Sequence, residues 1–344
     1  MKQKIFLILP ILLLLVTGIL LGTNPEFPGI LAAIRQVSLP YLGIACALMG
    51  GYWLLNAGIL KLLFQTKQEQ LSWKHAIQLT MVGQYYSAIT PFASGGQPAQ
   101  ILSMTAKKIP VGRATSLLMV KFLIYQICVV LFAFGFFAWE YRFVRATLST
   151  SFPWILLGLI LNGLLILLIF LSLIKRSWME RSINRLLTWI GGKKRNFKEK
   201  QWKDKIHQSF DDYEQSATAV KDSPVLAGKA FILTFLQLTA FFAVSWAIYH
   251  SFGFSRTGIT RILALQALLY MAISFIPTPG NAGASEGGFI LVFQLLFTGA
   301  TLMPAMLLWR MITYYLNLLF GGLVTLYDHW ECSQLTIKKA SSQG

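Results

Sequence analysis

The sequence predicts an all-α integral membrane protein, with six full spans and two broken, re-entrant helical hairpins arranged as an inverted repeat. The first observation behind this fold class is composition. Of the 344 residues, 55% are hydrophobic and only 12% are charged, whereas about a quarter of the residues of a soluble domain carry charge. The second is that long apolar stretches alternate with short clusters of Lys and Arg. The third is a motif rich in Pro, Gly and Ser that interrupts two of the apolar regions.

Six apolar stretches are long enough to cross a bilayer, because a helical span needs roughly 20 apolar residues. The first of them also looks like a signal peptide, but no small-residue cleavage site follows it, and we interpret it as a span. The six stretches lie at about 4–22, 38–60, 114–138, 152–174, 226–251 and 303–327, and the two broken regions at about 75–105 and 259–300. The expected organisation is a first membrane repeat (1–138), a connecting loop with the first span of the second repeat (139–174), a basic amphipathic cytoplasmic segment (175–225), the remainder of the second repeat (226–327) and a cytoplasmic tail (328–344).

The net charge of +17 is explained better by the positive-inside rule of membrane proteins than by a nucleic-acid-binding surface. With both termini in the cytoplasm, 23 of the 30 Lys and Arg fall on the cytoplasmic side and 5 on the outside. We therefore expect no nucleic-acid partner, and we expect anionic lipid headgroups instead. The three cysteines and four histidines form no metal-ligand pattern, so we expect no metal and no cofactor, and a homo-oligomer is left open.

The basic segment 175–225 holds 12 Lys and Arg against 7 Asp and Glu. Its apolar residues recur at helical spacing, which is typical of a helix lying in the headgroup region. A solvated linker helix with an ordinary amphipathic face is the alternative. The segment is too short for an independent catalytic domain.

The break motif occurs twice in the same order. The sequence TPFASGGQP occupies residues 90–98, and TPGNAGASE occupies residues 278–286. A basic residue follows each motif, Lys121 at 31 residues after Thr90 and Arg310 at 32 residues after Thr278, and a tyrosine follows one turn later. The charge pattern makes the first region dip in from the cytoplasm and the second from outside, which is the plan of many secondary transporters. The alternative is that each region simply crosses the membrane twice.

Broken helices inside a bilayer expose backbone groups that must be buried in protein or line a wet cavity. Proline stops the incoming arm, and glycine permits the turn and close approach. The restarting arms offer free N–H groups and a positive dipole end, which attract phosphate. The alternative to a substrate cavity is that these glycines only permit tight helix packing. The candidate substrate-binding residues in the two breaks are Thr90, Pro91, Ser94, Gly95, Gly96, Gln97, Pro279, Gly280, Asn281 and Gly283.

Ionisable residues in the apolar body of the chain are few, expensive and usually face the bundle interior. Glu286, Lys121 and Arg310 are the candidates, with Tyr125 and Tyr314 one turn after the two cations. The cations could hold a lipid phosphate, and the carboxylate could take a proton or pair with a cationic headgroup. Alternatively, Glu286 and Arg310 only neutralise each other as a buried pair. No catalytic motif is present in the sequence, so we name no catalytic residue.

The two motifs and the arginine after the second resemble those of the lysylphosphatidylglycerol synthase membrane-domain family, the flippase part of MprF-type proteins. The resemblance runs over roughly residues 5–330 and rests on residues 90–98, 277–286 and 310. Many relatives carry Glu and Arg at the positions of Gln97 and Gln100, and Arg at that of Lys121. The resemblance implies a multi-pass protein of a bacterial-type plasma membrane. Full-length members also carry a cytoplasmic domain that transfers lysine to phosphatidylglycerol, and no such domain is expected within these 344 residues.

The leading hypothesis is a flippase-like translocator whose partner is a membrane phospholipid with an anionic headgroup, which could be an aminoacylated phosphatidylglycerol. A phosphatidylglycerol lysyltransferase type of lipid modification is a second hypothesis, although its catalytic domain is missing from the sequence. A non-transporting regulator of lipid metabolism is the third.

Overall fold

The structure is a computed structural model. It describes residues 27–64, 71–147, 224–274 and 276–341, with a few isolated positions between 148 and 223. Regular structure in these ranges is helical. Apart from isolated positions, the spans expected at 4–22 and 152–174 and the basic segment at 175–225 lie outside the described residues.

Four helices of the described part are long and apolar enough to cross a membrane, and the chain is therefore a multi-pass membrane protein. The fourth is a continuous helix in which α14, a short π-helical turn η1 and α15 follow one another. The remaining spans expected from the sequence fall on these four helices. Their bounds are Leu39–Phe64 for α3, Val111–Trp139 for α6, Pro224–Ser251 for α11, Gly299–Arg310 for α14, Met311–Tyr315 for η1 and Leu316–Ser341 for α15.

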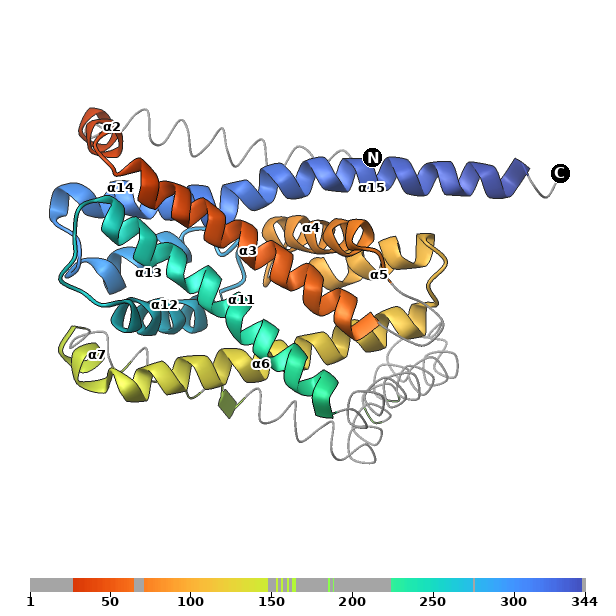
Figure 1. Cartoon of the computed structure of the whole chain (residues 1–344), viewed down its shortest axis with the longest axis horizontal. Helices are drawn as coiled ribbons and strands as arrows, with labels where there is room; N and C mark the ends of the chain where they lie inside the picture. The colour runs from red at the N-terminus through yellow and green to blue at the C-terminus, as the bar shows by residue number, and fades with distance from the viewer. Residues whose placement is uncertain are drawn as a thin grey trace.

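The two interrupted regions form helical hairpins. Helices α4 (Trp73–Ile89) and α5 (Gly96–Ala106) have 17 and 11 residues, and helices α12 (Ile259–Ile273) and α13 (Ala284–Phe293) have 15 and 10. Each arm is shorter than the roughly 20 residues of a full span. Figure 1 shows the hairpins at opposite ends of the bundle, and their breaks meet in the middle. We call these ends the α4 end and the α12 end.

Two short helices complete the α12 end. Helix α2 (Phe27–Arg35) precedes α3 and contacts α14, and helix α7 (Tyr141–Thr147) follows α6 and contacts α12. Both fall in stretches that the sequence leaves as loops between spans.

Local chemistry explains where the first hairpin begins and breaks. Ser72 caps α4 because its Oγ accepts a hydrogen bond of 3.2 Å from the backbone N–H of His75. Helix α4 ends at Ile89, and Pro91 follows two residues later. Proline has no N–H to donate, so the helix cannot continue through it.

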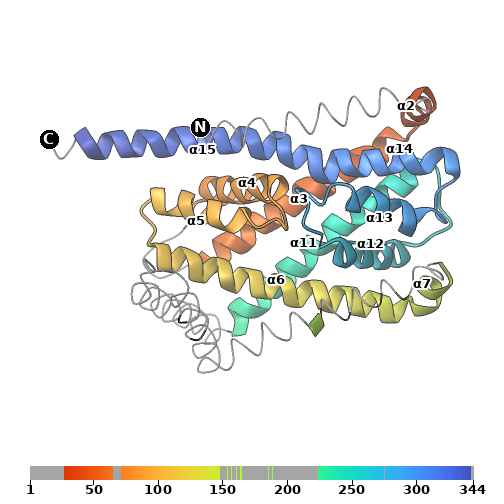
Figure 2. The ribbon, with the colours of Figure 1, turned by 180° about the vertical axis from the view of Figure 1, so that it is seen from behind.

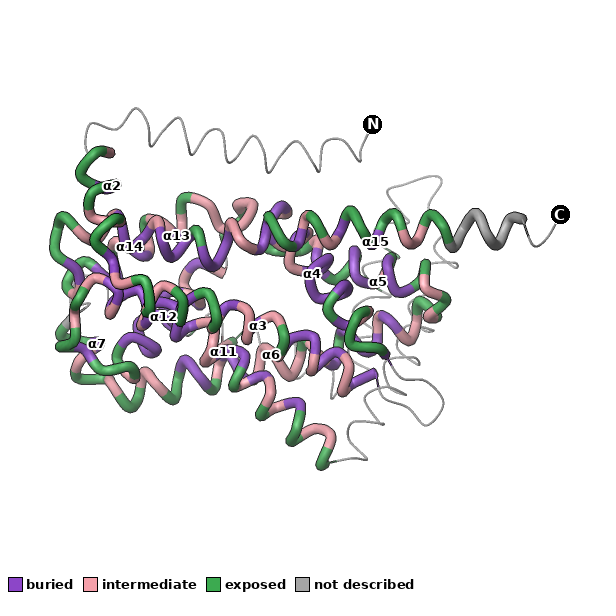
Figure 3. The backbone as a smooth tube through the Cα atoms, turned by 45° about the horizontal axis from the view of Figure 1, so that its top comes forward, coloured by how far each residue is buried: buried purple, intermediate pink, exposed green. Residues whose placement is uncertain are grey.

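The core of the bundle lies between α3, α6, α11 and α12. Helix α11 packs along α3, and Figure 2 shows α6 on the other side of the pair, where it contacts α11 and α12. Met49, Phe132 and Phe242 are fully buried at this junction. Figure 3 shows that the outward faces of the same helices are exposed. Those faces carry large apolar side chains, as a lipid-facing surface requires, among them Leu54, Leu131, Ile232 and Leu236.

A cytoplasmic tail was expected from residue 328 onward. Helix α15 continues through this position to Ser341. It packs against α4 and α5. The carboxylate side chain of Asp328 is consequently buried between these helices.

Candidate functional site

The two breaks share one local backbone conformation. After the proline of each motif, two consecutive residues take positive φ angles. These are Phe92 and Ala93, at 55° and 53°, and Gly280 and Asn281, at 58° and 53°. Left-handed φ angles are costly for residues other than glycine, so they persist only where the surroundings impose them.

The turn hydrogen bonds are matched as well. The N–H of Ser94 donates to the carbonyl of Pro91, and the N–H of Ala282 donates to that of Pro279, at 3.1 Å each. The prolines lie 188 positions apart in the chain, and so do the two donors. The recurrence of the motif in sequence is therefore accompanied by recurrence of its backbone geometry.

The two breaks contact each other directly. Pro91 and Pro279 form an antiparallel backbone bridge, although they belong to hairpins from opposite ends of the bundle. Tyr314 adds a second link, because its hydroxyl donates a hydrogen bond of 3.2 Å to the carbonyl of Ala88, at the end of α4. A residue of η1 is thus tied to the first hairpin.

Arg310 is fixed at this junction by three groups. Its Nη1 and Nη2 donate to the carbonyl of Gly280 at 3.3 and 3.2 Å. Its Nε lies 2.6 Å from Oε1 of Glu286, and its guanidinium lies 4.3 Å from the centre of the Tyr314 ring. The other oxygen of Glu286 accepts a hydrogen bond of 2.7 Å from the N–H of Gly283. The arginine side chain is 7% exposed and the glutamate side chain 30%, so the carboxylate is the accessible member of the pair.

A π-helical turn follows Arg310 and contains Tyr314, four positions later on the same helix face. It spans Met311–Tyr315, directly after the arginine. Such turns insert one residue into an α-helix and are frequent at functional sites. Asn317 follows on the same helix and accepts a hydrogen bond of 2.7 Å from the indole N–H of Trp53, which ties α3 to α15.

The first break is held by its own threonine. The Thr90 hydroxyl donates to the carbonyl of Tyr86 at 2.6 Å and accepts from the N–H of Gly95 at 2.8 Å. Gly96 is buried so closely against the helix before it that a Cβ would lie 2.1 Å from Oγ of Ser87. This supports the packing interpretation for that glycine. Pro91, Ser94 and Gln97 are exposed, as is Gly283 in the second break.

Lys121 and Tyr125 belong to a neighbouring polar cluster. The Lys121 amine donates to the side-chain carbonyl of Asn56 on α3. The hydroxyls of Tyr125 and Tyr270 are 2.8 Å apart. In the described part of the chain, no contact joins Lys121 to Arg310, so the structure places the two candidate cations in two adjacent clusters.

Gly280 and Tyr314 give a first testable prediction. A Cβ on Gly280 would lie 2.1 Å from Cε2 of Tyr314, and the φ angle of 58° disfavours any other residue. Gly280→Ala is expected to lower the free energy of unfolding by at least about 2 kcal/mol, through left-handed strain and displacement of the ring. Thermal unfolding in detergent measures this. Gly287→Ala is the matched control, because its Cβ meets no atom within 4 Å; equal losses in both variants would contradict the prediction.

A buried ionic network at the α4 end was missed by the sequence analysis. Lys107 at the end of α5 pairs with Asp328 of α15, with side chains 8% and 7% exposed. Ser103 donates to the same carboxylate at 2.7 Å. Lys107 also lies 3.5 Å from Glu331, which accepts a hydrogen bond of 3.0 Å from buried Gln78. We call these five residues the α4-end network. The sequence does contain a signal for this network, because an aspartate and a glutamate three positions apart share one helix face.

A smaller ionic cluster lies at the α12 end. Glu140, directly after α6, accepts a hydrogen bond of 2.6 Å from the Thr260 hydroxyl and lies 3.4 Å from Nε of Arg261. Glu140 and Asp328 are 188 positions apart, the separation of the two bridged prolines. At each end, a carboxylate on a long helix or directly after one therefore binds the adjacent hairpin.

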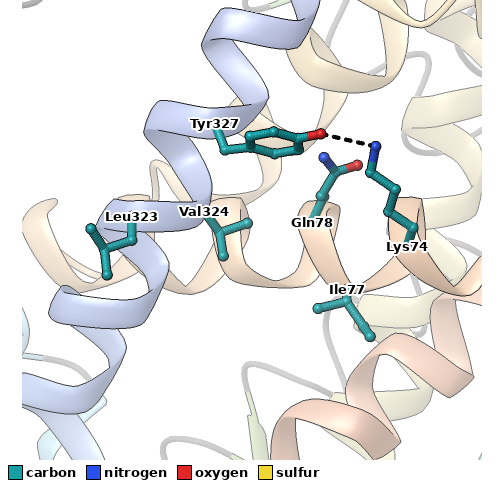
Figure 4. Close-up of a pocket in the computed structure, with 6 residues that line it drawn as sticks. All are labelled: Lys74, Ile77, Gln78, Leu323, Val324 and Tyr327. Carbon is teal, nitrogen blue, oxygen red and sulfur yellow. Dashed lines mark hydrogen bonds between the residues drawn. The ribbon is translucent and has the colours of Figure 1, made fainter.

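A groove of about 380 Å³ lies beside the α4-end network, between α4 and α15. Figure 4 shows Lys74, Gln78 and Tyr327 at its polar end, with the Lys74 amine 3.1 Å from the Tyr327 hydroxyl. The rest of the lining is apolar and consists of Ile77, Leu323 and Val324. Within the described ranges, no group of three His, Cys, Asp or Glu could hold a metal ion.

Comparison with known proteins agrees with this architecture. Residues 5–321 match the family described as lysylphosphatidylglycerol synthase TM region. The chain is also 25% identical, over 309 residues, to a UPF0104 membrane protein of Archaeoglobus fulgidus, an alignment that covers 86% of this chain and 89% of the relative. On the match over nearly its whole length, the chain belongs to the lysylphosphatidylglycerol synthase TM region family.

Proposed function

We propose that the protein translocates a phospholipid between membrane leaflets and binds the headgroup where the two broken hairpins meet. The observation that carries the proposal is the contact between the breaks at Pro91 and Pro279, with Arg310 held beside it. Irregular backbone at membrane depth is tolerated only in protein or along a wet cavity. Pro91 and Ser94 are exposed among the described residues, which favours the cavity.

The chemistry of the site favours a phosphate with a neighbouring cationic group. A guanidinium matches the geometry of phosphate oxygens and is the preferred side chain for binding them. Glu286 now occupies one face of Arg310. A headgroup phosphate would take its place, and the released carboxylate would accept an amine of the same headgroup. An aminoacylated phosphatidylglycerol or a zwitterionic phospholipid satisfies both groups, and Lys121 in the neighbouring cluster extends the cationic path.

The organisation as an inverted repeat is part of this proposal. The common turn geometry and the shared separation of 188 residues support two related halves. In this arrangement the α4 end is cytoplasmic, the α12 end is external, and both hairpins are re-entrant. Rocking of one half against the other would open the site to each leaflet in turn.

A vesicle assay tests the proposal. Purified protein is reconstituted into phosphatidylcholine–phosphatidylglycerol vesicles that carry a headgroup-labelled fluorescent phospholipid, and a membrane-impermeant reductant is added. Wild-type protein is expected to bring the inner-leaflet label within reach of the reductant, and the Lys121→Ala, Arg310→Ala variant is expected to behave as protein-free vesicles do. Lys229→Ala is the control, because that exposed lysine lies at the start of α11. Full activity in the double variant would contradict the proposed site.

A further inference from the structure

The groove between α4 and α15 runs from a polar end to an apolar floor. Its polar end contains Lys74 and Tyr327. Ile77 follows Lys74 along α4 toward the break, and Leu323 precedes Tyr327 by one turn on α15. Both elements therefore carry their polar residue toward the α4 end and their apolar residue toward the middle of the bundle.

Exposed aromatic residues mark the depth of the polar end. Trp73, Tyr327 and Trp330 are 52%, 44% and 60% exposed at this level. Tryptophan and tyrosine are enriched at the membrane–water interface, where one side of the ring is wet and the other apolar. The polar end of the groove thus lies at headgroup depth, and the floor lies at acyl-chain depth.

We propose that this groove binds one phospholipid molecule, with the phosphate on Lys74 and Tyr327 and an acyl chain along Ile77, Val324 and Leu323. The proposal rests on the proposed function, for which it supplies the entrance from the leaflet at the α4 end. The occupant is a lipid phosphate, because an exposed cation and a hydroxyl donor stand at the head of an apolar channel.

The cation of the groove is free to exchange its partner. Lys74 lies 2.9 Å from Glu331, and its side chain is 56% exposed. Glu331 is only 20% exposed, but it keeps Lys107 and Gln78 as partners when Lys74 binds a phosphate instead, so the exposed lysine can change partner at small cost. Lys107 and Asp328 lie deeper, at 8% and 7% exposure, and they would keep α5 and α15 together while Lys74 changes partner.

Photolabelling tests the groove. The full chain, in nanodiscs, is irradiated with phosphatidylglycerol that carries a diazirine near the glycerol, and the labelled peptides are mapped by mass spectrometry. Wild-type protein is expected to be labelled around residues 73–78 and 323–330. Lys74→Gln is expected to lower this labelling about tenfold, the equivalent of one charge-assisted hydrogen bond. Val324→Phe, which fills the floor, is expected to lower it as well, and Lys74→Arg to retain it.

Two controls separate phosphate recognition from general contact with lipid. Lys108→Gln removes one charge from an exposed lysine of the same end and is expected to leave the labelling unchanged. A diazirine diacylglycerol with the same chains is expected to label these residues weakly. Equal labelling by the diacylglycerol, or no loss in Lys74→Gln, would overturn the proposal.

The proposal about the groove and the proposal about the translocation site can be refuted independently. Loss of transport in the Arg310 variants without labelling of the groove would overturn only the groove. Labelling that depends on Lys74, in a protein that moves no lipid, would overturn only the translocator.

Discussion

Replacing Arg310 with alanine is expected to abolish lipid translocation and to lower the free energy of unfolding by about 2–3 kcal/mol. The arginine side chain is 7% exposed and contacts Gly280, Glu286 and Tyr314. Its loss leaves the carboxylate of Glu286 with a single backbone partner, the N–H of Gly283. The cost stays below that for a fully buried pair, because the glutamate is 30% exposed.

Three variants separate binding from stability at this position. Arg310→Lys keeps the charge but loses the planar fork, so transport is expected to fall while most stability is kept. Arg310→Ala combined with Glu286→Ala removes both members of the pair, and thermal unfolding should show recovery of part of the lost stability. Transport by that double variant at the wild-type rate would show that the pair is structural only.

The largest loss of stability is expected for Asp328→Asn. The Lys107 ammonium would then lie in a nearly inaccessible position, opposite a neutral amide, with only the more distant Glu331 as an anionic partner. Removing one member of a buried ion pair typically costs about 3–5 kcal/mol. We expect the melting temperature in detergent to fall markedly and α5 to become susceptible to proteolysis near Lys107.

Lys74→Gln is the matched control for Asp328→Asn. It also breaks an ion pair to α15, but on the exposed side of the network, with a lysine side chain that is 56% exposed. Its cost should stay below about 1 kcal/mol. Equal melting temperatures for the two variants would show that burial does not set the strength of this network.

The sequence was sufficient to predict the hairpins because their determinants are local. Proline cannot continue a helix, and a Thr-Pro turn followed by glycine looks the same wherever it occurs. The breaks are accordingly found after Thr90 and Thr278, as expected. The pairing of Glu286 with Arg310 was one of two alternatives, and the structure shows the contact; whether the pair also binds lipid remains a prediction.

The parts that could not be predicted depend on contacts distant in sequence. Lys121 binds Asn56, 65 positions earlier on another helix, and no sequence feature near either residue indicates this pairing. Asp328 was assigned to a tail because the apolar pattern fades before it, and helix ends are the least reliable part of such an analysis. The π-helical turn after Arg310 has no sequence signature that distinguishes it from an ordinary α-helical turn.

The bridge between Pro91 and Pro279 affects how any mutational scan of this protein is interpreted. It joins main-chain atoms, and side-chain replacement leaves main-chain atoms in place. An alanine scan would therefore underestimate the contact between the two breaks, while it would detect a side-chain link such as the Tyr314 hydrogen bond to Ala88. Substitutions in either motif would be tolerated as long as the turn keeps its backbone conformation. Relatives could therefore differ at other positions of the two motifs and still keep the two breaks in contact.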